Sequence, residues 1–218
     1  ACPSGALKAW GEDMSVSDVM AVIEKDRNYY ERSGGGVTVS GGDPLMQSDF
    51  TRELLKACRD AGIHTCLEST FNIDWKIAED VVRYADLIIS DIKHMDSEIH
   101  RKYTGAGCEK VLENLRRLAL DGHDMILRIP LIPGINDDMQ NISRTADFIE
   151  QNIGERLKTL QLLSFMRMGE EKCMSLDRVY EMKDLEFDRE EFQEKVEKIA
   201  GYFNDRGIHC VVGTKEKE

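Results

Sequence analysis

Charged side chains and glycines occupy the carboxyl ends of four consecutive predicted strands. The set consists of Gly41, Gly42 and Asp43 after the first strand, Glu68 at the end of the second, Asp91 and Lys93 at the third, and Arg128 in the fourth. A single charged residue in such a place is typical of a solvated loop, whereas four strand ends in a row indicate a site. Because the carboxyl ends of parallel strands converge on one edge, we expect these groups to lie together.

The types of these residues indicate the chemistry of a ligand. Lys93 and Arg128 can hold a carboxylate, the arginine through its two-pronged guanidinium. The three acidic side chains, together with the carbonyls of the Gly41-Gly42 turn, can accept hydrogen bonds from an ammonium group and a ribose diol. Glycines let the backbone approach a ligand closely because no Cβ intervenes. An amino acid joined to a nucleoside carries all of these groups.

The hydrophobic pattern predicts strands and helices in alternation. The predicted strands are 37–40, 64–68, 87–91, 125–132, 160–165 and 208–212, and the predicted helices are 15–32, 50–58, 75–84, 111–120, 139–151 and 192–203. Buried strands separated by helices favour parallel pairing with right-handed crossovers. We therefore expect an α/β fold in the form of a full or partial (β/α) barrel.

Composition narrows the class of protein. The 218 residues include 29 basic and 41 acidic ones, which gives a net charge of −12. A field of this sign repels phosphate backbones and anionic lipids, so we expect neither a nucleic-acid nor a membrane partner. The six cysteines show no CxxC spacing, which favours reduced thiols in the core of a cytoplasmic protein. We also expect a monomer.

Four segments match one family in order and spacing. Residues 37–47 (VTVSGGDPLMQ) resemble the GGEP motif of radical S-adenosylmethionine (SAM) enzymes, and residues 91–96 (DIKHMD) with His100 resemble their DxK motif and the loop after it. Residues 128–134 (RIPLIPG) and 162–165 (LLSF) with Gly169 match as well. In this form the motifs resemble the activating enzymes of glycyl radical enzymes, such as pyruvate formate-lyase activating enzyme.

The resemblance implies a partial (β/α)6 TIM-like barrel that binds SAM beside a 4Fe-4S cluster. By position in the family motifs, the methionine amino group would be held by Gly41, Gly42 and Asp43, and the methionine carboxylate by Arg128. Glu68 would face the ribose, and Asp91 and Lys93 would face the amino-acid moiety. His100 would contact a partner glycyl radical enzyme. The implied activity is reductive cleavage of SAM to a 5'-deoxyadenosyl radical that takes hydrogen from a glycine of the partner. An electron donor such as flavodoxin or ferredoxin is implied too.

One part of the family pattern is absent from the sequence. There is no CxxxCxxC loop and no strand before it, although at least three thiolates are needed to hold the cluster. We therefore expect an N-terminally truncated activating enzyme, with residues 1–14 as the tail of a ferredoxin-like insertion and 15–218 as the barrel domain. Cys2 would be the last ligand of an auxiliary cluster in that insertion, and we expect no iron in this chain alone. Asp43 replaces the usual glutamate, and residues 68–71 lack the glycine that many members have there.

Other functions fit some of the same residues. Lys93 at a strand end can act as the Schiff-base lysine of a barrel lyase, with Glu68 or Asp91 as a proton shuttle. The chain can also be a non-catalytic barrel that binds SAM, another nucleoside or a partner protein. A weaker hypothesis is a hard cation held by Glu68 and Asp91.

Overall fold

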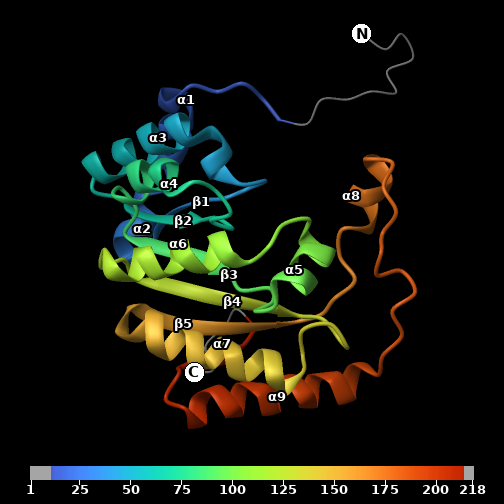
Figure 1. Ribbon diagram of the computed structural model, residues 1–218. Coiled ribbons are helices and arrows are strands. Elements are labelled where there is room, and N and C mark those ends of the chain that lie inside the picture. Colours follow the sequence, from blue (N-terminus) through green and yellow to red (C-terminus); the bar gives the residue numbers. More distant parts are fainter. Residues whose placement is uncertain (1–10, 214–218) are drawn as a thin grey trace, which may run out of the picture.

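Short runs of aliphatic and β-branched residues form six strands in the computed structural model, which describes residues 11–213 (Figure 1). They are β1 (Gly36–Val39), β2 (His64–Glu68), β3 (Leu87–Asp91), β4 (Met125–Leu131), β5 (Leu157–Ser164) and β6 (Cys210–Val212). Each strand pairs in parallel with the next one in the chain, so the order of the sheet is β1-β2-β3-β4-β5-β6. Their carboxyl ends therefore share one edge, as the sequence predicted.

Helices connect the strands. They are α1 (Val16–Ile23), η1 (Glu24–Asp26), α2 (Arg27–Ser33), η2 (Pro44–Gln47), α3 (Ser48–Asp60), α4 (Trp75–Val82), α5 (Ser97–Thr104), α6 (Glu109–Leu120), α7 (Met139–Asn152), η3 (Gly154–Arg156), α8 (Glu170–Ser175) and α9 (Arg189–Asp205). Right-handed crossovers between strands in sequential order place the connecting helices on the same face of the sheet. Within the described residues, no helix is both long and apolar enough to cross a membrane.

Strand β4 shows how the two faces of the sheet differ. Leu127 and Ile129 are at most 1% exposed and belong to the main core cluster, which also contains apolar residues of α6, α7 and α9. Arg128 lies between them in the sequence, so its side chain points to the opposite face. Asp91 is its partner in register on β3. The face away from the core thus carries the charged groups.

The six predicted strands and five of the predicted helices are confirmed, with ends that differ by up to three residues, and the remaining helices differ as follows. The helix expected from Ser15 to Arg32 is divided into α1, η1 and α2, and Gly34, with a φ of 66°, follows its end. Helices α5 and α8 were not predicted, because their sequences, SEIHRKYT and EEKCMS, contain too few apolar residues to show a clear apolar period. Figure 1 shows both on the right of the view, past the strands that they follow.

Candidate functional site

A chain of ion pairs links the carboxyl ends of β2 and β3 to Arg128, which lies in the middle of β4 rather than at its end. Arg128 donates from Nη2 to Glu68 Oε1 at 2.6 Å and from Nε to Asp91 Oδ1 at 2.8 Å. Lys93 Nζ lies 2.9 Å from the other oxygen of Asp91. Four of the seven residues predicted to bind a ligand are therefore in one network, which we call the strand-end network. The contacts of Arg128 join β4 to its neighbour β3 and, past β3, to β2, over 37 and 60 residues of sequence.

The network is balanced in charge and partly shielded from water. Burial acts to raise the pKa of Asp91, but the Lys93 ammonium and the Arg128 guanidinium outweigh it and lower this pKa below its usual value. Burial also acts to lower the pKa of Arg128, but the hydrogen bond to Glu68 and the charge of Asp91 raise it on balance. Asp91 and Arg128 are therefore both charged at neutral pH. Among the described residues none accepts a hydrogen bond from Nη1 of Arg128, so this nitrogen can meet an added carboxylate.

Asp43 does not join the strand-end network. Its Oδ1 accepts from the amide of Leu45 at 3.1 Å and from Ser69 Oγ at 2.9 Å. Its Oδ2 accepts from the amide and the hydroxyl of Thr70, at 3.1 and 2.6 Å. The carboxylate caps η2 and ties the loop after β1 to the loop after β2. Both oxygens are thus engaged within the protein, which leaves the amino group of a ligand to other acceptors.

The predicted Gly41-Gly42 turn supplies such acceptors. Gly41 and Gly42 have φ angles of 94° and 34°, and a Cβ at either position would meet no atom within 4 Å. Positive φ rather than crowding therefore calls for glycine here, since side chains are strained in this region. The turn keeps its backbone exposed beside the end of β1.

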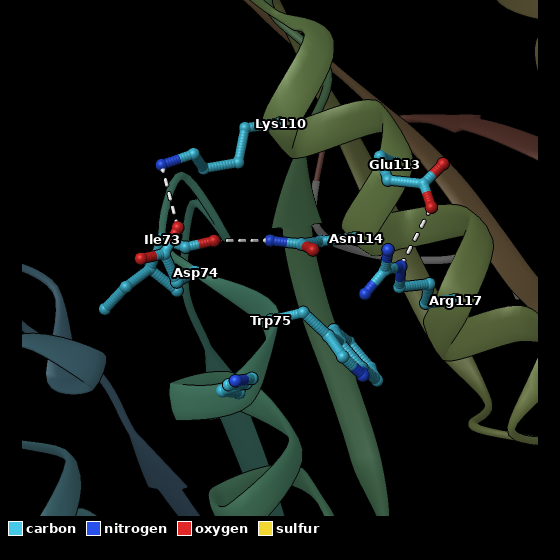
Figure 2. A pocket seen from close by; sticks show the side chains of 8 residues that line it. Ile73, Asp74, Trp75, Lys110, Glu113, Asn114 and Arg117 are labelled. Atoms are coloured by element: carbon cyan, nitrogen blue, oxygen red, sulfur yellow. Dashed lines mark hydrogen bonds and ion pairs between the residues drawn. The ribbon is translucent and has the colours of Figure 1, made fainter.

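The loop after β2 adopts a left-handed backbone without a glycine. Phe71 has a φ of 54° and a fully buried side chain. Asn114 of α6 donates to the carbonyls of Phe71 and Ile73, both at 2.8 Å, and Figure 2 shows its amide directed at Ile73. The left-handed backbone costs roughly 1–2 kcal/mol for a residue other than glycine. Core packing of the ring and the two hydrogen bonds offset this strain.

The cavity in Figure 2 lies outside the strand-end network. It has a volume of about 460 Å³ and is bordered by residues of the loop after β2, α4 and α6. Lys110 pairs with Asp74 at 3.3 Å, and Arg117 pairs with Glu113 at 2.8 Å while its guanidinium lies 5.7 Å from the Trp75 ring centre. These four charged side chains are thus paired with one another within the protein. We interpret these ion pairs as stabilising, from the outside, the loop after β2 that Asn114 also holds.

His100 is turned inward. The residue is 7% exposed, and its Nδ1 lies 2.6 Å from the carbonyl oxygen of Ala106 and 2.9 Å from Thr104 Oγ1. The ring thus holds the turn that follows α5. A partner protein can contact this ring only after the turn opens. The structure shows His100 stabilising the turn, and its role in partner binding stays a prediction.

Comparison with known proteins places these features in a family. The sequence model of the Radical SAM superfamily matches residues 2–146. The chain belongs to this superfamily. More narrowly, it is a member of the glycyl radical enzyme activating enzymes: it is 58% identical over 215 residues to a (2S)-3-sulfopropanediol dehydratase activating enzyme of Klebsiella oxytoca, covering 99% of this chain and 68% of that protein.

More distant relatives agree. A 4-hydroxyphenylacetate decarboxylase activating enzyme of Clostridioides difficile is 37% identical, over 97% of this chain and 66% of its own length. The chain thus spans about two thirds of the length of these curated relatives. A domain of pyruvate-formate lyase-activating enzyme from Bacteroides vulgatus has a TM-score of 0.66 at 29% identity, covering 83% of this chain and 99% of that one. Streptococcus suis SuiB bound to S-adenosylmethionine has a TM-score of 0.70 at 13% identity, over 95% of this chain and 45% of its own, and shares the fold.

The radical SAM family implies two cofactors, and the described residues of this activating enzyme fit only one of them. Cys58, Cys66, Cys108 and Cys210 are buried, and burial raises the pKa of each thiol, that of Cys210 to about 12. Such thiols do not readily form the thiolates that iron needs. From residue 11 to 213, no group of three histidine, cysteine or acidic residues can hold a metal ion. The strand-end network and the Gly41-Gly42 turn, in contrast, offer donors and acceptors for SAM. Cys2 lies outside the described residues.

The same observations weigh against a hard cation. Glu68 and Asp91 already share Arg128, and Asp91 also meets Lys93. A divalent ion would have to displace two fixed positive charges. The carboxylates of Glu68 and Asp91 are therefore already neutralised by Arg128 and Lys93.

Three residues of the site were missed by the sequence analysis. Asn114, Asn136 and Asn141 are 2–4% exposed, and each joins backbone segments at the carboxyl edge of the sheet. Asn114 had a recognisable signal, because it interrupts the apolar stripe of α6 between Val111 and Leu115. Asn136 follows Pro133-Gly134 in a loop, where asparagine is common for local reasons and gives no signal of its own.

Proposed function

We propose that this chain is the SAM-binding body of an enzyme that activates a glycyl radical dehydratase acting on a sulfonated diol such as (2S)-3-sulfopropanediol. The observation that carries the proposal is the strand-end network of Arg128 with Glu68, Asp91 and Lys93. The choice of partner rests on the 58% identity to the Klebsiella oxytoca activating enzyme. A flavodoxin or ferredoxin as electron donor, a monomeric state and a cytoplasmic location remain predictions.

The site residues fit the charged groups of SAM. Arg128 offers Nη1 to the methionine carboxylate, and the carbonyls of Gly41 and Gly42 can accept from the ammonium group. Of the two carboxylates that pair with Arg128, that of Glu68 is the more exposed: its side chain is 30% exposed, against 16% for Asp91. It is therefore the acceptor that ribose hydroxyls reach most easily. In this arrangement Asp43 fixes the loops and does not touch the ligand.

The protein's own contribution is to hold a charged ligand in one orientation. Bound together, SAM and a 4Fe-4S cluster supply a one-electron reductive cleavage in this family. The fixed charges of the strand-end network orient the amino-acid end without reorganising, which is how preorganised groups act. Because the described residues hold no cluster ligands, we assign no catalytic residue in this chain. Three expectations from the sequence remain proposals: a partial barrel without its first strand, a boundary between an insertion tail and the barrel domain at residues 14 and 15, and Cys2 as a ligand of an auxiliary cluster.

Calorimetric titration of the chain with SAM tests the binding function. Replacement of Arg128 by methionine should weaken binding by roughly 1.5–3 kcal/mol, the contribution of a charged hydrogen bond. Arg206→Met is the matched control, because Arg206 also bridges two carboxylates, those of Asp147 and Glu150, but on the helical exterior. Equal affinities in the parent and Arg128→Met would remove the site assignment.

The partner is tested separately with the full-length activating enzyme. Under anaerobic conditions with reductant and SAM, it should produce a glycyl radical signal in electron paramagnetic resonance with a sulfopropanediol dehydratase. A 4-hydroxyphenylacetate decarboxylase should give little signal under the same conditions. The reverse preference would refute the assignment of the partner while leaving SAM binding intact.

The lyase alternative is not favoured by the geometry. Lys93 Nζ forms an ion pair with Asp91 at 2.9 Å, which attack on a carbonyl would have to break. A Schiff-base lysine must be a neutral amine when it attacks a carbonyl. Borohydride trapping with carbonyl substrates should therefore leave Lys93 unlabelled.

A further inference from the structure

Asn136 connects the two loops that follow β3 and β4. Asn136 is 2% exposed, and its Nδ2 donates to the carbonyls of Lys93 at 2.9 Å and Pro130 at 2.8 Å. Its Oδ1 accepts from the amide of Ile132 at 2.8 Å. One side chain thus provides two donors and one acceptor to three backbone groups, which an amide can do and a carboxylate or hydroxyl cannot.

A second asparagine continues this connection. Asn141 of α7 donates from Nδ2 to the carbonyl of Asn136 and accepts at Oδ1 from the amide of Met95, both at 2.9 Å. Arg144, one turn further along α7, donates to the carbonyl of Met95 at 2.9 Å. The segment from Lys93 to Met95 is therefore held at three backbone atoms by side chains from beyond β4.

This support begins where the sheet stops. Strand β3 ends at Asp91, and the last backbone bond to β4 is from the Ile92 amide to the Arg128 carbonyl at 2.9 Å. The carbonyl of Lys93 is thus bonded by Asn136 and not by strand pairing. The ammonium of Lys93 stands on a long, flexible side chain that is 38% exposed. Its contact with Asp91 depends on where its backbone is fixed.

We propose that Asn136 is a positioning residue for the ligand site: by fixing the carbonyl of Lys93, it keeps the Lys93 ammonium on Asp91 and the strand-end network in its binding form. The relevance to ligand binding rests on the proposed function. The geometric part, that Asn136 controls the place of Lys93, can be tested without a ligand.

Asn204 is a matched control within the same chain. Its Nδ2 donates to the carbonyls of Ala200 and Cys210, both at 2.9 Å, and its Oδ1 accepts from the Cys210 amide at 3.1 Å. It makes the same three hydrogen bonds as Asn136, but next to the start of β6, at the opposite edge of the sheet. Asn136 is buried whereas Asn204 is exposed, so Asn136→Ala should lower the melting temperature more. The two variants are therefore compared at a temperature at which both are fully folded, so a difference in other measurements does not come from unfolding.

Two measurements decide the proposal. The first is competitive acylation of lysines in the ligand-free chain, read by peptide mass spectrometry with the other lysines as internal references. Asn136→Ala should raise labelling of Lys93 several-fold, and Asn204→Ala should leave it unchanged. The second is calorimetric SAM affinity, where we expect a loss of about tenfold, which corresponds to about 1.4 kcal/mol, for Asn136→Ala alone.

Asn136→Asp and Asn141→Ala keep the test decisive if Asn136→Ala does not fold. The aspartate preserves the shape and the bond from Ile132 but places a carboxylate against two carbonyls, so it should also release Lys93. Unchanged Lys93 labelling in folded variants at Asn136 or Asn141 would overturn the proposal. A parent chain that does not bind SAM would refute the proposed function, and the labelling result would still decide the role of Asn136.

Discussion

Removing Arg128 should leave two carboxylates without their shared cation. In Arg128→Met, Asp91 keeps its ion pair with Lys93. Glu68 and Asp91 lose the guanidinium that lies between them, 2.6 Å from Glu68 Oε1 and 2.8 Å from Asp91 Oδ1. A hydrogen bond to a charged group contributes about 1.5–3 kcal/mol. Partial exposure of these side chains, 16–30%, reduces this value through solvent screening. We expect the free energy of unfolding to fall by about 2 kcal/mol.

A double-mutant cycle isolates the interaction from other effects. Asp91→Asn removes the partner charge, and the double variant Arg128→Met/Asp91→Asn should lose less stability than the sum of the two single losses, by about 1–2 kcal/mol. Urea unfolding at pH 7 with a constant m-value measures each stability. Arg206→Met should cost at most about 1 kcal/mol, because the carboxylate partners of Arg206 are 38–49% exposed. Single losses that simply add, to within about 0.5 kcal/mol, would refute the reasoning.

The same variant should change how stability depends on pH. Burial opposes ionisation of Asp91, but Lys93 and Arg128 outweigh it, so the pKa of the folded protein lies below the usual value. The unfolded chain then binds the proton first as the pH falls, so the stability from this group is present above its usual pKa and is lost as the pH falls through the folded value. The difference between parent and Arg128→Met should therefore shrink from pH 7 to pH 3. A constant difference would contradict the assignment.

Three further predictions concern the supports of the site. Phe71→Gly should destabilise the fold by about 2–4 kcal/mol in urea unfolding, because the lost core packing exceeds the strain relieved; a gain in stability would show that strain dominates. Asp43→Ala should weaken SAM binding by loosening the two loops that its carboxylate joins, and hydrogen exchange in the loops after β1 and β2 should increase; slow exchange in both loops would contradict this role. Ellman's reagent should modify Cys173 of α8 quickly and buried Cys210 slowly in the folded chain, because burial raises the pKa of the Cys210 thiol to about 12.

The sequence determined the order of strands and the edge at which the site lies. Hydrophobic periodicity is a local property, so the segments 64–68 and 87–91 coincide with β2 and β3 at both ends. Parallel connections then require all carboxyl ends to share one edge. The seven candidate ligand residues were placed on that edge from types and spacing alone, and four of them meet in one network.

Only the tertiary structure decided which partner each side chain takes. Asp43 resembles a ligand contact in the sequence, but Ser69 and Thr70 from the next loop occupy its carboxylate. His100 resembles a partner contact, but its ring closes a turn beside Ala106. These partners are set by the register between strands and by the path of loops, which hydrophobic periodicity does not encode.

The buried asparagines show the same limit most clearly. Asn136 and Asn141 lie in segments where the sequence pattern gives only a loop and a helix, and their chemistry is visible only against Lys93 and Met95, more than forty residues earlier. A short polar side chain becomes a positioning group when folding brings unpaired backbone atoms within 3 Å of it. The sequence therefore determined which groups can bind a charged ligand, and the packing of loops across strands decided how they are held.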